Sequence, residues 1–211
     1  MKLSACYAFV FIAAAAFAEH APIDLDPHNS NGAWLYYDNG TPGWVIWDST
    51  YRGVWFNIQD FIPGMNEGYI WQAEFWFYHS TNYPWDTSDV YVELWNGDMN
   101  GPTAQIDQQV ITAIHYTPLY VEYFGEAGHV EQNFWVITNV EMSAGGWPST
   151  VTDWAGSTVA HSFMSDDLIV WEPFEVNGLL SNFFIRADWA SCPNYNAFRN
   201  STWGSLKATF Q

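Results

Sequence analysis

The chain has 211 residues, with 23 Asp and Glu against 5 Lys and Arg, and a formal net charge of −18 at pH 7. So acidic a chain repels phosphate backbones and anionic lipid surfaces, which excludes nucleic-acid binding and disfavours anionic membranes. The length suffices for one sizeable all-β domain.

Residues 1–18 have the pattern of a secretory signal peptide. Lys2 supplies a positive start, the chain is apolar from Ala5 to Phe17, and Ala16-Phe17-Ala18 places small residues where a signal peptidase cuts. The apolar stretch is shorter than the roughly 20 residues of a membrane span. We therefore predict a secreted protein, extracellular or at the cell surface, with no membrane insertion after cleavage. An uncleaved anchor is the alternative.

Signal cleavage would remove Cys6 and leave Cys192 as the only cysteine. An intrachain disulfide is then impossible, so core packing must hold the domain together. Cys192 is expected to be either a buried small hydrophobe or a bridge between chains.

Beyond the signal peptide the chain shows strand patterns and almost no helical pattern. Residues 19–32 are polar with two prolines and predict a loose N-terminal arm, followed by a single domain over residues 33–211. There, apolar residues recur at every second position between Gly, Pro, Asn and Asp turns. The predicted strands are Ala33–Tyr37, Trp44–Trp47, Gly53–Ile58, Tyr69–Tyr78, Val90–Trp95, Gln105–Thr112, Leu119–Phe124, Phe134–Val140, Val159–Phe163, Leu168–Trp171, Leu179–Ala187 and Leu206–Phe210. This pattern predicts an all-β fold, a two-sheet antiparallel β-sandwich that is jelly-roll-like.

Alternation is clearest in Tyr69–Tyr78 and Val90–Trp95. In the first strand Trp71, Ala73, Phe75 and Phe77 share one face, and Ile70, Gln72, Glu74, Trp76 and Tyr78 share the other. If the two strands pair as neighbours, their mixed faces form one aromatic platform beside Glu74, Glu93 and Gln72. That platform would consist of Trp76, Tyr78, Tyr91 and Trp95.

Several short motifs follow one another in a familiar order: Trp34–Gly40, Gly53–Phe56, Tyr69–Tyr78, Val90–Pro102 and Ser181–Ala187. Over residues 33–190 the chain resembles a jelly-roll-like β-sandwich domain of the "YDDG … IRA" type, found in uncharacterised exported bacterial proteins. The resemblance implies an accessory or surface module. No catalytic motif comes with it.

The tryptophan content is the most informative chemical feature, because all 14 tryptophans lie after residue 18. Indoles stack on the apolar faces of sugar rings, and large aromatics with a polar edge suit binding surfaces generally. The alternative is that a disulfide-free domain needs these side chains in its core. The predicted ligand-binding residues are the platform residues Trp76, Tyr78, Tyr91 and Trp95, and the loop residues Trp85 and Trp147.

Asn96-Gly97-Asp98-Met99-Asn100-Gly101 resembles the start of a calcium loop, with Asp107 at its twelfth position. Calcium prefers six to eight oxygen ligands, which such loops supply from alternate residues. We therefore consider calcium as a cofactor held by Asn96, Asp98, Asn100 and Asp107. The alternative is an ordinary hairpin turn, where the same residue types are expected.

Hydrolase signatures are missing from the sequence. It has no Gly-x-Ser-x-Gly, its six histidines are scattered, and it has no Glu-x-Asp-x-Glu strand motif. No catalytic residue is predicted. The sequence favours a non-catalytic binding module for a glycan or another cell-surface polymer. A structural or self-associating assembly subunit and a glycoside hydrolase are the alternatives.

Overall fold

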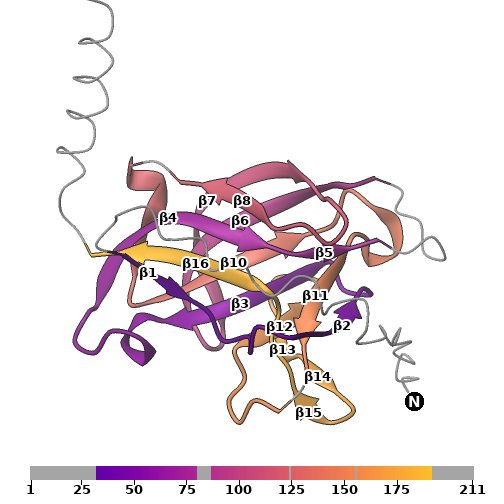
Figure 1. Cartoon of the computed structure of the whole chain (residues 1–211). Coiled ribbons are helices and arrows are strands. Elements are labelled where there is room, and N and C mark those ends of the chain that lie inside the picture. Colours follow the sequence, from indigo (N-terminus) through magenta and orange to yellow (C-terminus); the bar gives the residue numbers. More distant parts are fainter. Residues whose placement is uncertain (1–31, 80–86, 124, 155, 192–211) are drawn as a thin grey trace, which may run out of the picture.

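The computed structural model describes residues 32–79, 87–123, 125–154 and 156–191 (Figure 1). It confirms the predicted all-β antiparallel sandwich. The predicted signal peptide, almost all of the predicted arm, both cysteines and the predicted strand at 206–210 lie outside these residues. Within them, no helix has the length and apolar character needed to cross a membrane.

One layer of the sandwich is a five-stranded antiparallel sheet in which β1, β16 and β4 lie side by side (Figure 1). β8 continues this sheet beyond β4, and β9 pairs with the other end of β4. The bounds are β1 (Gly32–Leu35), β16 (Ile185–Ala190), β4 (Glu67–Phe75), β8 (Leu119–Glu122) and β9 (His129–Glu131).

The other layer is a six-stranded antiparallel sheet in the order β13-β12-β3-β10-β6-β7. Its strands are β13 (Glu172–Pro173), β12 (Ser162–Ser165), β3 (Tyr51–Asn57), β10 (Asn133–Asn139), β6 (Asp89–Asp98) and β7 (Gly101–Thr112).

Two small sheets and three short 3-10 helices complete the described fold. The first small sheet consists of β2 (Pro42–Ile46), β11 (Ser149–Asp153) and β5 (Phe77–Tyr78). The second is the hairpin of β14 (Glu175–Val176) and β15 (Leu179–Leu180). The 3-10 helices span Ile58–Asp60, Gly125–Gly128 and Ala144–Gly146.

The main core lies between the two large sheets. Its fully buried side chains come from alternate positions of facing strands, so the residues between those positions point outward on each sheet. The five-stranded sheet contributes Leu35, Ala73, Phe75, Val121, Ile185 and Ala187, and the six-stranded sheet contributes Val54, Phe56, Val90, Val92, Leu94, Phe134 and Val136. Burying each large apolar side chain is worth about 1.5–3 kcal/mol.

The pairing of Tyr69–Tyr78 with Val90–Trp95, on which the predicted aromatic platform depended, does not occur. β4 pairs with β16, β8 and β9 in one sheet, whereas β6 pairs with β10 and β7 in the other. Alternation predicts which residues share a face, but it does not encode which strand lies alongside, because that depends on contacts distant in the sequence. The two strands therefore do not share a platform.

β4 also departs from simple alternation. Asp188 lies opposite Gln72 and Trp189 lies opposite Ile70, so Trp71 is an extra residue in a β-bulge. Because of the bulge, the side chains that precede it point to the opposite faces from those that alternation predicts. Ile70, and not Trp71, therefore joins the core with Ala73.

The apolar run Leu168–Trp171 is not a strand. It forms the loop between β12 and β13, in which the Asp167 carboxylate accepts hydrogen bonds from the backbone N–H groups of Ile169 and Val170. Ile169 is 79% exposed. Conversely, Ser149–Asp153 forms the buried strand β11, which was not predicted from the sequence although its three central residues are β-branched and favour strands.

Candidate functional site

Three tryptophans on adjacent strands form a row on the outer face of the six-stranded sheet. Trp135 of β10 lies directly opposite Trp55 of β3 and Trp95 of β6. Each points outward because its sequence neighbours point into the core. We call the outer side of this sheet the six-stranded face; its members are Tyr51, Trp55, Tyr91, Glu93, Trp95, Gln108, Trp135, Ile137, Asn139, Phe163 and Trp171.

A fourth tryptophan, Trp171, covers the row. Its ring centroid lies 4.8 Å from that of Trp135, and its indole N–H donates to the Leu168 carbonyl at 3.1 Å. Glycine is needed beneath it, because a Cβ at Gly53 would lie 3.1 Å from the Trp135 ring and 3.3 Å from that of Trp171. Trp135 is consequently fully buried, whereas Trp55, Trp95 and Trp171 stay partly exposed.

A buried carboxylate orders the polar part of the face. Glu93 is 1% exposed and accepts hydrogen bonds from the Trp95 indole at 2.7 Å, the Gln108 amide at 3.0 Å and the Asn139 amide at 2.9 Å. All three donors are neutral, so the buried carboxylate is satisfied by hydrogen bonds and not by an ion pair. The bond from the Trp95 indole also fixes the orientation of that ring. Burial, followed by the charges of Glu141 and Glu93, raises the pKa of Tyr51 at the edge of this cluster.

The six predicted ligand-binding residues do not gather in one place. Tyr91 and Trp95 lie on the six-stranded face, both partly exposed. Trp85 lies outside the described residues. Trp147 stacks with 5.2 Å between ring centroids on Trp47, which packs against the cluster of β2 and β11.

Trp76 and Tyr78 belong to a different cluster beside β11. Trp76 is only 7% exposed, and its indole donates to Glu74 at 2.6 Å. Tyr78 contacts His115 with ring centroids 4.7 Å apart. Trp76 therefore offers little surface to a ligand, and a role for these residues in binding stays a prediction.

The four predicted calcium ligands are also not brought together. Asp98 lies opposite Gly101 at the hairpin tip, whereas Asp107 lies opposite Leu94, about 13 Å further along the strands. The Asp98 carboxylate accepts the backbone N–H of Asn100 at 2.8 Å, as in an ordinary Asx turn.

The other three predicted ligands, Asn96, Asn100 and Asp107, also bond within the protein, and the Asn100 amide donates to Asp98 at 3.0 Å. The side-chain oxygen of Asn96 accepts the backbone N–H of Glu131, and Asp107 accepts the amide of Gln109. Among the described residues no group of three or more His, Cys, Asp and Glu could hold a metal ion. Calcium binding stays a prediction that this geometry does not support.

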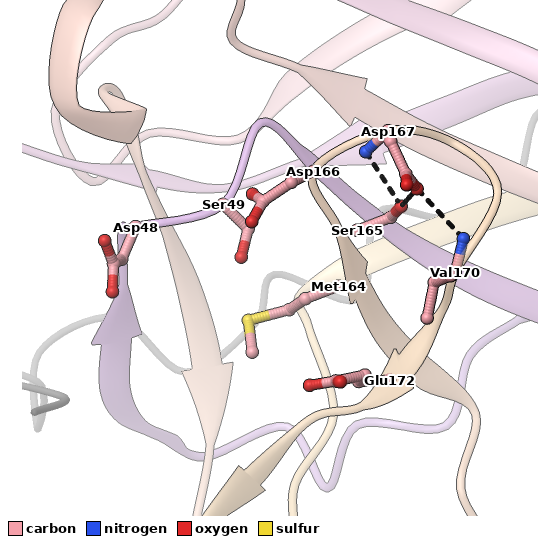
Figure 2. A pocket seen from close by; sticks show the side chains of 8 residues that line it. All are labelled: Asp48, Ser49, Met164, Ser165, Asp166, Asp167, Val170 and Glu172. Carbon is pink, nitrogen blue, oxygen red and sulfur yellow. Dashed lines mark hydrogen bonds between the residues drawn. The ribbon is translucent and has the colours of Figure 1, made fainter. Parts of the chain in front are cut away.

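An acidic pocket of about 300 Å³ lies beside β12 (Figure 2). Its lining contains four carboxylates and no cationic side chain. The lining residues are Asp48, Ser49, Met164, Ser165, Asp166, Asp167, Val170 and Glu172. Such a lining accepts hydrogen bonds from hydroxyl or ammonium groups and repels anions.

The four carboxylates differ in their existing bonds. Backbone N–H groups of Val170 and Ile169 hold the pKa of Asp167 below its usual range, and Asp166 accepts the backbone N–H of Thr50 at 3.3 Å. Asp48 and Glu172 make no hydrogen bond or ion pair within the described residues.

Buried Arg52 positions one wall of the pocket. Its guanidinium donates to the carbonyls of Pro148 at 2.7 Å and Ser49 at 3.1 Å, and also to that of Gly146. Burial lowers the pKa of Arg52 to about 9, against the opposing effect of the Asp48 charge. The arginine thus ties the β2–β3 corner to the loop before β11.

Sequence reasoning missed Trp55, Trp135 and Trp171 as members of a surface. A signal was present in Val54-Trp55-Phe56 and Phe134-Trp135-Val136, where three consecutive residues are apolar. A strand without polar alternation is covered on both faces, so these triplets indicate a second apolar layer outside the main core.

No protein-family model matches the chain, and neither a curated protein nor a solved structure matches it at a significant level.

Proposed function

We propose that this protein is a secreted, non-catalytic module that binds a carbohydrate on the six-stranded face. The observation that supports it is the in-register row in which the partly exposed Trp55 and Trp95 flank the buried Trp135, with the partly exposed Trp171 packed on Trp135. Indoles present flat apolar surfaces to the C–H face of a sugar ring, and their N–H edges stay polar.

Hydrogen-bonding groups border these indoles. The exposed Gln108 amide is held by Glu93 and retains a carbonyl oxygen that can accept a sugar hydroxyl. Because Glu93 also fixes the Trp95 ring, little side-chain freedom is lost when a ligand binds. The acidic surface favours glycans without carboxylate or sulfate groups.

Glycan binding is tested with the full secreted chain on an array of polysaccharides, followed by titration calorimetry on the glycan retained. We expect Trp95→Ala to weaken binding on this face at least about tenfold, which corresponds to a loss of about 1.4 kcal/mol or more. Trp154→Ala removes a partly exposed indole elsewhere and serves as the matched control. Absence of binding to every glycan, or unchanged affinity in a folded Trp95→Ala variant, would refute the proposal.

Assembly into a larger structure is a second candidate, favoured by the edge strand β7. It is the last strand of the six-stranded sheet, spans twelve residues, and exposes Val110 by 56%. Long edge strands with apolar side chains pair readily with another chain. Light scattering tests this candidate: an assembly mass that falls to that of a single secreted chain in a Val110→Lys variant would support it.

A further inference from the structure

The outer side of the five-stranded sheet carries a second aromatic and polar surface. Trp34 and Tyr36 flank the core residue Leu35, and Tyr120 and Glu122 flank the core residue Val121, so all four point away from the core. Between them, Arg186 lies opposite Glu74, and Asp188 lies opposite Gln72. We call this the five-stranded face; its members are Trp34, Tyr36, Gln72, Glu74, Tyr120, Glu122, Arg186 and Asp188.

Arg186 supports the most exposed ring of this face. Its guanidinium donates to both Asp38 carboxylate oxygens, at 2.9 and 2.6 Å, and lies 3.3 Å from Glu74. The same guanidinium lies 5.2 Å from the centroid of Tyr36, a cation–π contact. Tyr36 nevertheless stays 48% exposed, so its ring is held in place with one side toward solvent.

Trp34 and Tyr120 extend the aromatic surface across the sheet. They come from the two outer strands β1 and β8, about 14 Å apart across three strand spacings. Their ring centroids are only 6.3 Å apart, so both rings lean inward over β16 and β4. Burial, and then the charge and hydrogen bond of Glu74, raise the pKa of Tyr120 to about 12.

The charges of this face define the chemistry of a ligand. Two carboxylates, those of Asp38 and Glu74, already neutralise Arg186, and Glu122 is exposed at the rim. A ligand carboxylate or sulfate would meet a surplus of negative charge. Hydroxyl or ammonium groups on an apolar ring would instead meet acceptors beside the three aromatic rings.

We propose that the five-stranded face is a second saccharide site, selective for neutral or amino sugars, and that the protein therefore bridges two polysaccharide chains. The two faces lie on opposite sides of one core, since each sheet packs its other side into the sandwich. Bridging rests on the proposed function of the six-stranded face, whereas the second site does not.

The test uses the full secreted chain with Tyr36→Ala, Trp95→Ala and the double variant. Calorimetry with short neutral oligosaccharides and with an amino-sugar oligosaccharide counts the sites, and turbidity of a long neutral glucan or polygalacturonate reports bridging. We expect two sites in the unaltered chain, one in each single variant and none in the double variant. Turbidity should appear only with the unaltered chain, and not with polygalacturonate. Tyr36→Phe retains the ring and should behave as the unaltered chain.

The outcomes separate the two proposals. A single site that Trp95→Ala removes and Tyr36→Ala leaves intact would overturn the second site and retain the proposed function. A single site with the opposite response would retain the second site and overturn binding on the six-stranded face. Equal binding of polygalacturonate would overturn the selectivity, and absence of any saccharide binding would overturn both proposals.

Discussion

Altering Asp38 should destabilise the fold strongly, because it would break a buried ion pair with Arg186. The Asp38 side chain is fully buried and that of Arg186 is 11% exposed, so solvent screens the pair little. Asp38→Asn keeps the size of the side chain but removes its charge and one acceptor of the paired bonds. Breaking a buried ion pair by altering one partner costs about 3–5 kcal/mol. Because Glu74 remains 3.3 Å from the guanidinium, we expect the lower end, about 3 kcal/mol.

This loss should be visible in thermal and urea unfolding at pH 7. For a chain of this length, each kcal/mol lowers the melting temperature by about 2–4 °C, so a fall of about 6–12 °C is expected. Glu122→Gln neutralises an exposed carboxylate of the neighbouring sheet surface and should change stability by less than about 0.5 kcal/mol. A loss below about 1 kcal/mol for Asp38→Asn would refute the role assigned to the pair.

Three further predictions concern packing, pH and calcium. Gly53→Ala places a Cβ 3.0 Å from Ile137 and should cost about 1–3 kcal/mol in urea unfolding; an unchanged midpoint would contradict this. Burial lowers the pKa of His161 below 6.5, so the stability it contributes is fully present above pH 6.5 and is lost as the pH falls from 6.5 to the lowered pKa of the folded state; His161→Gln should flatten the pH dependence of unfolding. EDTA should leave the melting temperature unchanged, because Asp107 lies far from Asp98; a clear fall would revive the calcium hypothesis.

Local alternation identified much of the core from the sequence. Val90, Val92 and Leu94 are all fully buried, as their spacing predicts. The bulge at Trp71 was not visible, since it is a property of pairing with β16 and leaves no mark in the residues of β4 alone. The exposed run at 168–171 was misread because its turn depends on one carboxylate, that of Asp167, which captures two backbone N–H groups.

The sequence predicted that aromatic side chains form a surface, but it did not predict which residues form it. Trp95 was identified from its own strand, yet its neighbours Trp55 and Trp135 lie 40 residues away on either side in the sequence. The Arg186–Asp38 pair likewise joins two segments that are separated by 148 positions. The order of strands in each sheet determines which residues become neighbours, and a short sequence motif does not reveal that order.

The single core between the two sheets sets a fixed spacing for anything bound outside it. Packed sheets lie about 10 Å apart, and side chains on both outer surfaces bring the separation to roughly 20 Å. Because both sheets pack on one core, the same short oligosaccharide cannot reach both surfaces, so a short ligand gains no chelate advantage from them. The sandwich would behave as a rigid spacer, and the stiffness of a polysaccharide gel should rise with the number of spacers added to it.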